Sequence, residues 1–559
     1  MAITWKQFER YWYLFSLAVI IASLPFSKLG LSIGQMMMAG GWIVERFDWR
    51  RLISSLHERL TLRSVLNSVP LSFFLLFNGI VTGFKQFAKN RPALIFSSIF
   101  LFHILGLFFT TDFDYAFKDL RTKFPILLLP LLLSTSEAID RKSFYRFMFL
   151  FVMAVLVRSG YNTWMISIHH FVDIREVSHN VSHIIFSLLL TLSIYSLIFF
   201  ILKRDFLVIW QKGLLLVILA WFLVYIIISQ SFTGLTVTLI TLLVLIPVLI
   251  FKTRNRRMKT ILILGVLVII TGLFLSLRSF VRNYYHVNPV DFTKLDQKTS
   301  RGNPYIHNVA STQTENGNYL WIYIQWDEMR GAWQKRSRIS FDSLNKKNET
   351  VAFTIVRYLT SKGWRKDADA IERLKPEEVD AIEKGIANYI FRDEFSIRGR
   401  IYEFLWGFDN YRETGNPTGS TLMQRFEFWK ASVGIISDNW LTGVGTGDMN
   451  LAFKAQYEKM HTKLSPDQRW RSHNQFLSIF IGFGLFGFFW FLFSLCYPPF
   501  VLHRFDDYFF LIFLIISVSS MLAGDTIESQ TGVSFFAIFY SLFLFARKEK
   551  EPIFHQESK

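Results

Sequence analysis

The sequence predicts an all-α integral membrane protein with about twelve transmembrane helices and one large, mainly helical loop subdomain. The chain has 559 residues, of which 51% are hydrophobic and 17% aromatic. These apolar residues come in long runs, and a run of roughly 20 is the length that crosses a bilayer. A single long polar stretch, 281–472, interrupts the runs.

Twelve segments are expected to be spans, each about 20 residues long or slightly shorter. The stretch Leu71–Phe84 is also apolar, but Asn78, Gly79, Thr82 and Gly83 dilute it, so we expect an interfacial helix there. In chain order the expected spans are Tyr11–Phe26, Leu29–Val44, Pro92–Thr110, Phe124–Ser136, Phe144–Trp164, His183–Leu202, Gly213–Ser229, Gly234–Phe251, Thr260–Phe280, Gln475–Leu495, Tyr508–Leu522 and Gly532–Ala546.

The formal net charge of +18 lies largely in short loops between these segments. Every second loop is rich in Lys and Arg, for example 46–63 and 252–259, whereas the short loops between them hold few. Basic residues favour the cytoplasmic side of a membrane, so both termini are expected there and the polar stretch outside. Because the charge serves orientation, we expect no nucleic-acid partner.

The ends of the chain and its cysteine content add two expectations. Lys6 and Arg10 precede an apolar run as in a signal peptide, but no small-x-small cleavage site follows, so we expect a retained first span. Cys496 is the only cysteine, which excludes an intramolecular disulfide.

The pattern divides the chain into four parts. Nine spans form a membrane domain at 1–280, an external subdomain follows at 281–472, three more spans form a membrane domain at 473–546, and 547–559 is a cytoplasmic tail. The external part is expected to fold, because Ser420 is placed to cap an amphipathic helix and Pro376 to begin another.

The most informative stretch surrounds the start of the tenth expected span. It holds a histidine and an asparagine at the mouth of the span, two glycines farther along the helix, a glycine-rich turn upstream, and arginines nearby. A turn histidine with small residues for helix packing would explain these features without any chemistry. The residues are Arg425, Trp429, Gly443, Gly445, Gly447, Arg471, His473, Asn474, Gly484 and Gly487.

This stretch resembles the signature of the O-antigen ligase and O-antigen polymerase superfamily. The pattern is His, then Asn, Ser or Gln, nine residues, Gly, two residues, Gly, and His473, Asn474, Gly484 and Gly487 fill it. The glycine-rich turn with Arg425 upstream resembles the family as well, and so does the layout of about a dozen spans with one large periplasmic loop. The sharp motif covers about a tenth of the chain.

The resemblance implies a metal-independent glycosyltransferase of the bacterial inner membrane, without a cofactor and with its active site facing the periplasm. The donor would be a glycan on undecaprenyl diphosphate, and the acceptor a glycan, lipid A–core or a protein. The leaving diphosphate is a stable anion that needs cations, and the guanidinium fork suits it. The acceptor hydroxyl must lose a proton, which the resemblance assigns to His473 as the base.

Three arginines are candidates for the diphosphate. Arg175 lies in a short outer loop where the family tends to carry a functional arginine, although it could pair with Asp173 or Glu176. Arg471 lies two residues before His473, although it could anchor to a lipid headgroup. Arg121, like Lys123, is a weaker candidate in an outer loop.

One position departs from the family, and several weaker signals remain. Related proteins often carry Ser-Arg in the short outer turn where Phe232 stands here, so Arg471 or Arg278 would substitute, or the donor is held differently. Arg158 lies inside an apolar run and is either functional or a snorkelling side chain. Asp525 and Glu528 either orient Arg or His groups or are solvated. His179 and His183 have the spacing of the two histidines in a zinc protease, but the glutamate base between them is missing. Asp112 and Asp114 resemble the acidic pair of metal-dependent sugar transferases, although two nearby aspartates are common.

Four functions therefore remain open on the sequence alone. The first is an O-antigen ligase-like transferase, and the second is a polymerase of the same superfamily that extends the glycan. The third is a flippase for lipid-linked sugars or another transporter, although no internal repeat is visible. The fourth is a receptor or scaffold, which would not need His473 and Asn474 at a membrane mouth.

Overall fold

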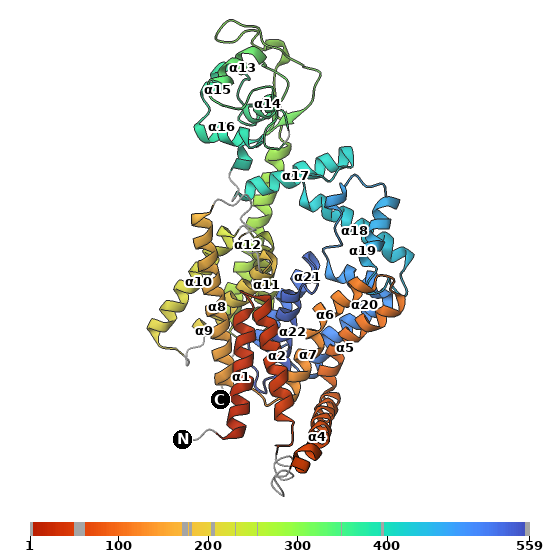
Figure 1. The fold of residues 1–559 in the computed structure, drawn as a ribbon. Helices are drawn as coiled ribbons and strands as arrows, with labels where there is room; N and C mark the ends of the chain where they lie inside the picture. The colour runs from red at the N-terminus through yellow and green to blue at the C-terminus, as the bar shows by residue number, and fades with distance from the viewer. Residues whose placement is uncertain are drawn as a thin grey trace. The chain divides into compact units, whose positions relative to one another are not determined.

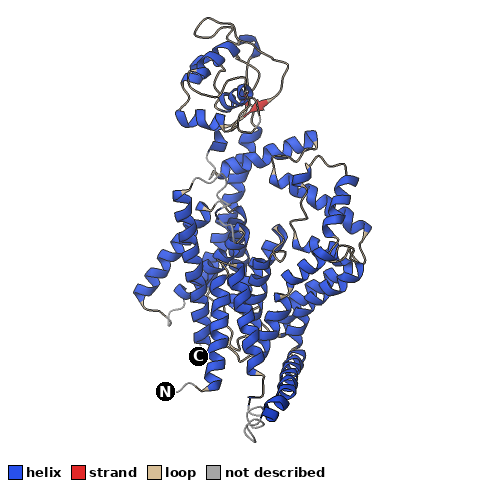
Figure 2. Ribbon diagram, in the orientation of Figure 1, coloured by secondary structure: helices blue, strands red, loops and turns tan. Residues whose placement is uncertain are grey.

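The computed structural model describes residues 4–49, 62–169, 177, 181–202, 207–229, 231–253, 255–347, 349–392 and 396–553, without the side chains of 62–70, 232, 252 and 397. The chain forms two compact units. Unit 1 comprises Met1–Leu262 with Arg425–Lys559, and unit 2 comprises Ile263–Gln424. Helices make up nearly all of the regular structure, which confirms the expected all-α class (Figures 1 and 2).

Unit 1 contains most of the apolar helices. Its largest hydrophobic cluster joins residues from both of its chain segments, for example Leu17, Leu188 and Phe539, none of which is exposed. The helices are α1 (Trp5–Ser23), α2 (Lys28–Glu45), α4 (Leu62–Lys89), α5 (Arg91–Leu105), η1 (Gly106–Phe109), α6 (Phe113–Lys123), α7 (Pro125–Thr135), α8 (Arg141–Ile168), α9 (His183–Leu202), α10 (Ile209–Ile228), α11 (Phe232–Lys252), α19 (Met449–Lys459), η5 (Pro466–Gln468), α20 (Gln475–Val501), α21 (Tyr508–Ala523) and α22 (Gln530–Leu544).

Eight helices in the described part of the chain have the length and apolar composition of membrane spans. Seven of them coincide with expected spans, and the eighth is Leu71–Lys89. The stretch Leu71–Phe84, where we expect an interfacial helix, lies within this eighth helix, and only 17% of its apolar window is buried inside the protein. Large apolar side chains such as Phe73 and Phe77 are exposed there, as on a lipid-facing helix.

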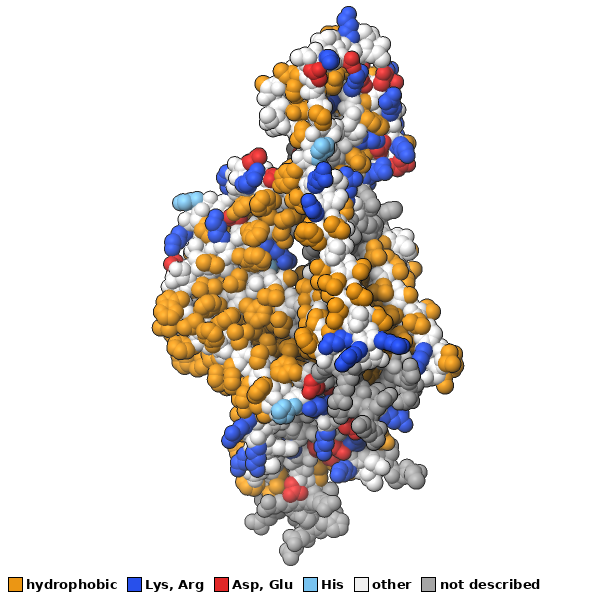
Figure 3. Space-filling view, turned by 180° about the vertical axis from the view of Figure 1, so that it is seen from behind, with side chains coloured by type: hydrophobic (Ala, Val, Ile, Leu, Met, Phe, Trp, Pro, Cys, Tyr) orange, Lys and Arg blue, Asp and Glu red, His pale blue; other side chains and the backbone are white. Residues whose placement is uncertain are grey.

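The remaining five expected spans also form helices, but these helices do not have the length or the apolar composition of the eight. Helix α7 has 11 residues, α21 has 16 and α22 has 15, while α1 and α2 do not reach the same apolar composition. Helices α21 and α22 are largely buried among other helices. Hydrophobic side chains also cover a broad field on the surface of the molecule, as Figure 3 shows.

Unit 2 has its own hydrophobic core, in which Trp333, Tyr358 and Phe341 are fully buried. A two-stranded antiparallel ladder pairs Thr314 with Tyr319, and the helix at Pro376–Glu383 begins where the sequence predicts it. Helix α12 (Arg256–Tyr285) runs from unit 1 into unit 2 along the chain. The other elements are η3 (Phe292–Lys294), β1 (Thr314–Glu315), β2 (Asn318–Tyr319), α13 (Trp326–Gln334), α14 (Val351–Ser361), α15 (Ala368–Glu372), α16 (Pro376–Glu383), η4 (Tyr389–Arg392) and α17 (Ile397–Thr414).

The end of the polar stretch belongs to unit 1 and not to unit 2. Helix α18 (Thr421–Asp438) begins at the boundary, and α19 follows it. Phe428 and Ile435 of α18 pack with Phe453 of α19 and Ile481 of α20 in one cluster. The compact division therefore falls near 424 and differs from the expected boundary at 472, because this apolar face is buried against a membrane helix.

Candidate functional site

The histidine and asparagine of the motif lie at the start of α20. Asn474 is the residue before the first turn, and its side-chain oxygen accepts hydrogen bonds from the backbone N–H groups of Phe476 (3.0 Å) and Leu477 (3.2 Å). Such a cap satisfies donors that the helix itself leaves unpaired. His473 precedes the cap with a φ of 46°, a conformation that histidine adopts more readily than most residues. Its side chain is 39% exposed, so a substrate has access to it.

The imidazole of His473 faces a buried carboxylate. Its Nδ1 lies 3.8 Å from an oxygen of Asp525, in the turn between α21 and α22. Asp525 also accepts a hydrogen bond from the hydroxyl of Ser478 at 2.9 Å. The Ser472 hydroxyl lies 2.7 Å from that of Ser478, and Trp429 donates to the Ser472 carbonyl at 3.1 Å. Residues 429, 472, 478 and 525 therefore fix the surroundings of the imidazole.

Burial is the main reason why the imidazole of His473 is neutral at neutral pH. Burial lowers the pKa of His473, and the positive charges of Arg425 and Arg471 lower it further, against the opposing effect of Asp525. Burial, and then the charge of Glu528, raise the pKa of Asp525. A neutral imidazole is the form that accepts a proton.

Arg471 lies two residues before this histidine, and among the described residues it forms an ion pair with one carboxylate, that of Glu528. Its Nη2 is 3.5 Å from an oxygen of Glu528, and its Nη1 is 3.9 Å from the sulfur of Met449. The guanidinium carbon stands 5.8 Å from the centre of the Tyr115 ring. Burial lowers the pKa of Arg471, but Glu528 and other neighbours outweigh it and the net shift is upward, so the side chain stays charged.

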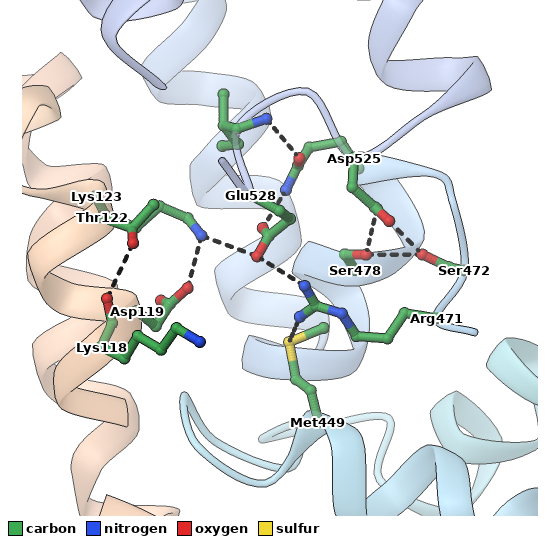
Figure 4. Close-up of polar contacts among 12 residues, drawn as sticks. Lys118, Asp119, Thr122, Lys123, Met449, Arg471, Ser472, Ser478, Asp525 and Glu528 are labelled. Carbon is green, nitrogen blue, oxygen red and sulfur yellow. Dashed lines mark hydrogen bonds and ion pairs between the residues drawn. The ribbon is translucent and has the colours of Figure 1, made fainter. Parts of the chain in front are cut away.

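Arg471 is connected through Glu528 to a network of buried charged side chains, which Figure 4 shows. Lys123, at the end of α6, is completely buried and contacts Glu528 at 3.0 Å and Asp119 at 2.8 Å. Asp119 also pairs with Nδ1 of His103 at 2.9 Å. Burial disfavours the charged form of each of these groups, but the oppositely charged neighbours have the larger combined effect. The pKa values of Asp119 and Glu528 are therefore lowered, and that of Lys123 is raised.

The motif glycines allow close packing of backbone on backbone. Gly484 interrupts α20 with φ 62° and ψ −162°, a conformation that is essentially restricted to glycine. A Cβ there would collide with the carbonyl oxygen of Leu441, and a Cβ at Gly443 would lie 2.5 Å from the carbonyl oxygen of Gly482. The N–H groups of Gly445 and Leu485 donate to the carbonyls of Gly482 and Trp440, at 2.9 and 2.8 Å.

The same glycine-rich turn is joined to the end of α5. A Cβ at Gly445 would lie 2.8 Å from the carbonyl oxygen of Gly106, and Gly447 leaves equally little space beside Asp112. Asp448 accepts backbone N–H bonds from Thr111 (2.9 Å) and Asp112 (2.8 Å). The turn thus joins α5, α6 and α20 around the site. Gly487 is also closely packed, in its case against Phe483.

The structure brings together only some of the predicted site residues. His473, Asn474, Arg471, Arg425 and the glycines belong to one region of unit 1, and Asp525 and Glu528 orient the histidine and an arginine there. Arg175, with its neighbour His179, lies outside the described residues, and the side chain of Phe232 is not described. Arg121 is exposed, and in the described ranges no ion pair joins it to the cluster. Arg278 belongs to unit 2.

Two weaker signals have structural explanations. Asp112 caps α6 by accepting from the N–H of Tyr115 at 3.0 Å, so one member of the acidic pair serves the helix start. Arg158 is 7% exposed and stands 5.3 Å from the Tyr161 ring, which places it inside the protein and not at a snorkelling position. Among the residues that the structure describes, no group of three or more His, Cys, Asp and Glu side chains is placed to hold a metal ion.

The arrangement can perform two kinds of chemistry. A partly exposed, neutral imidazole beside a carboxylate can take a proton from a hydroxyl. Two guanidinium groups near it, of Arg425 and Arg471, can bind an oxyanion such as a phosphate. Both functions meet at the end of an apolar helix, where a ligand with a lipid tail would present its polar head.

The comparison with known proteins bears on the same region. Residues 379–492 match the family model described as O-antigen ligase. The match includes the histidine motif, the glycine-rich turn and both arginines, but not Lys123, Asp525 or Glu528. No curated protein matches the chain.

Proposed function

We propose that this chain is a multi-pass membrane enzyme of the O-antigen ligase type, which transfers a glycan from undecaprenyl diphosphate to an acceptor hydroxyl. The match of residues 379–492 to the O-antigen ligase family model and the eight apolar helices support this proposal. The family implies a lipid-linked glycan and an acceptor as its partners in general. The observation that carries the specific proposal is the neutral imidazole of His473, which faces Asp525 and lies among the charges of Arg425 and Arg471.

His473 acts as the general base in this proposal. With Nδ1 toward Asp525, the favoured tautomer carries its proton on Nδ1 and leaves the lone pair of Nε2 for the substrate. Nε2 takes the hydroxyl proton as the acceptor oxygen bonds to the anomeric carbon of the donor. The bond from that carbon to the diphosphate oxygen breaks, and its electron pair leaves with the lipid diphosphate.

Arg471 and Arg425 bind the diphosphate as its charge develops. The leaving group is a stable anion, so it needs positive charge and hydrogen-bond donors and no proton. Arg471 has donors that no described carboxylate occupies, since its Nη1 contacts only the weakly accepting sulfur of Met449. Arg175 remains a proposed third contact, on the basis of its place in the sequence.

We further propose that the protein lies in the bacterial inner membrane with both termini in the cytoplasm and His473 facing the periplasm. The bias of Lys and Arg in alternate loops supports this orientation. A lipid A–core acceptor would make the enzyme a ligase, whereas a growing glycan would make it a polymerase.

Turnover of purified protein with a synthetic lipid-linked donor tests the role of His473. General-base catalysis contributes typically about 10²–10⁴-fold, so His473→Ala should lose about that factor in kcat and still bind the donor. The matched control is His461→Ala, since His461 is also in unit 1 with a positive φ but is exposed. Unchanged turnover in His473→Ala would end the catalytic assignment.

Glycan length in a deletion strain distinguishes the two forms of the reaction. Loss of a ligase leaves full-length glycan on undecaprenyl diphosphate, because elongation continues without transfer. Loss of a polymerase leaves single repeat units on the acceptor. Mass spectrometry of the lipid-linked pool and of the acceptor measures both quantities, and the ligase proposal predicts the first pattern.

A further inference from the structure

Lys123 is a fully buried cation at the end of α6, and the proposed reaction does not yet account for it. A buried charge is costly unless partners compensate it. Lys123 has two, Asp119 on its own helix and Glu528 in the α21–α22 turn. Asp119 is held in turn by His103 of α5. The lysine is thus fixed from three elements and has no path to solvent as a free surface charge.

Glu528 forms ion pairs with both Lys123 and Arg471. Its Oε2 accepts from Lys123 at 3.0 Å and lies 3.5 Å from Arg471, while its Oε1 accepts from Gln475 at 2.9 Å. The two cations therefore compete for one carboxylate oxygen, and the lysine is the closer. Figure 4 shows Glu528 between them.

We propose that Lys123 is a positioning residue for donor binding, which neutralises Glu528 and so keeps Arg471 available for the diphosphate. The proposal rests on the proposed function, in which Arg471 binds that group. If Lys123 were absent, Arg471 would be the one described cation that pairs with Glu528, and a close Arg–carboxylate pair occupies the fork that a phosphate needs.

Asp119 and His103 complete the network of charged side chains around Lys123. Asp119 balances the lysine charge, so that Lys123, Asp119, Glu528 and Arg471 together contain two positive and two negative charges. His103 donates from Nδ1 to Asp119, while its Nε2 is buried and has no hydrogen-bond partner among the described residues. The network thereby ties α5 and α6 to the turn that carries Asp525 and Glu528.

Donor affinity and turnover separate this role from a structural one. In Lys123→Met the donor KM should rise about tenfold or more, because one charge-assisted contact is lost, while kcat should change less than about threefold. Lys118→Met is the matched control, since Lys118 is an exposed lysine of the same helix. A variant that damaged the fold would lower kcat and thermal stability together.

The double variant Lys123→Met/Glu528→Gln tests whether the lysine acts through Glu528. Removing both charges should restore the donor KM to within about threefold of Glu528→Gln alone, the non-additivity that a coupled pair requires. If Lys123→Met does not fold, these two variants still decide, because removing both partners of a buried pair is tolerated better than removing one. A KM in the double variant as high as in Lys123→Met, or about tenfold above Glu528→Gln, would overturn the proposal.

Arg471→Ala shows which of the two proposals fails. If Arg471→Ala raises the donor KM and Lys123→Met does not, the positioning role is wrong and the diphosphate site stands. If neither variant changes the donor KM, Arg471 does not bind the donor and the assignment of the diphosphate site fails first.

Discussion

The imidazole of His473 is surrounded by charges of both signs, and they act on it in opposite directions. Burial, Arg425 and Arg471 lower its pKa, and Asp525 raises it. Because the net shift is downward, the neutral base persists below the ordinary value of 6.5. The acidic limb of the profile of kcat/KM against pH should therefore lie below pH 6.5, and activity should fall as the pH drops through it.

Two substitutions should move this limb in opposite directions. Arg425→Gln removes a charge that lowers the pKa of His473, so the limb should move to higher pH. Asp525→Asn removes a charge that raises it, so the limb should move to lower pH. Profiles of the two variants measured against the wild type check both signs. A limb that stays in place in both variants would show that another group titrates.

At the residue scale, the sequence predicts the motif but not its surroundings. His473, Asn474 and the glycines follow a fixed spacing, which is visible in one sequence. Lys123 and Glu528 are separated by hundreds of residues, and their contact depends on how α6 packs near the α21–α22 turn. The sequence offers two weak signals, Lys123 in an outer loop and the acidic residues in a turn between two short spans, and neither signal identifies its partner.

At the element scale, the break in α20 shapes the site. Gly484 interrupts the helix where the turn that carries Gly443 packs against it. The sequence shows two glycines in a span, but a packing stripe and a break look alike in it. The hydrogen bonds of Gly445 and Leu485 across this contact show which of the two is present.

Gly484→Ala should destabilise the protein by about 1–3 kcal/mol from the backbone conformation alone, and by more through the collision with Leu441. Gly482→Ala is the matched control two residues earlier, because a Cβ there would meet its nearest atom at 3.8 Å, an ordinary contact. Thermal unfolding of both purified variants in detergent measures the difference. Equal melting temperatures would contradict the strained conformation at Gly484.

Hydropathy predicts some of the membrane spans correctly from the sequence, but it is not sufficient for all of them. Among the long apolar runs, α9 has both of its predicted ends, and α20 begins at the predicted residue but continues past the predicted end at Leu495 to Val501. Helix α4 is long and apolar enough to be a candidate span, whereas its polar residues favour an interfacial helix, so hydropathy does not decide between the two. Helices α21 and α22 are short, and other parts of the protein bury most of their surface, which a sequence alone does not show.

At the scale of the whole molecule, the polar stretch 281–472 is divided between the two compact units. Its first part folds around Trp333 and Phe341 in unit 2, and its last part, from Arg425 on, packs onto α20 in unit 1. The motif arginines and the histidine are therefore carried by unit 1, although the composition of this stretch is polar throughout. The polar composition of the sequence locates the subdomain, but the packing of the apolar faces of α18 and α19 against α20 determines where the compact unit ends.

The orientation of the chain is testable with reporter fusions. Alkaline phosphatase folds only outside the cytoplasm, where its disulfides form. The bias of Lys and Arg predicts that Lys346 lies outside and Arg256 inside, so a fusion at Lys346 should be active and one at Arg256 inactive. A further fusion at Lys142, in another basic loop, should also be inactive. Because α20 begins directly after His473, an active Arg256 fusion with an inactive Lys346 fusion would place the histidine on the cytoplasmic side and remove it from any periplasmic reaction.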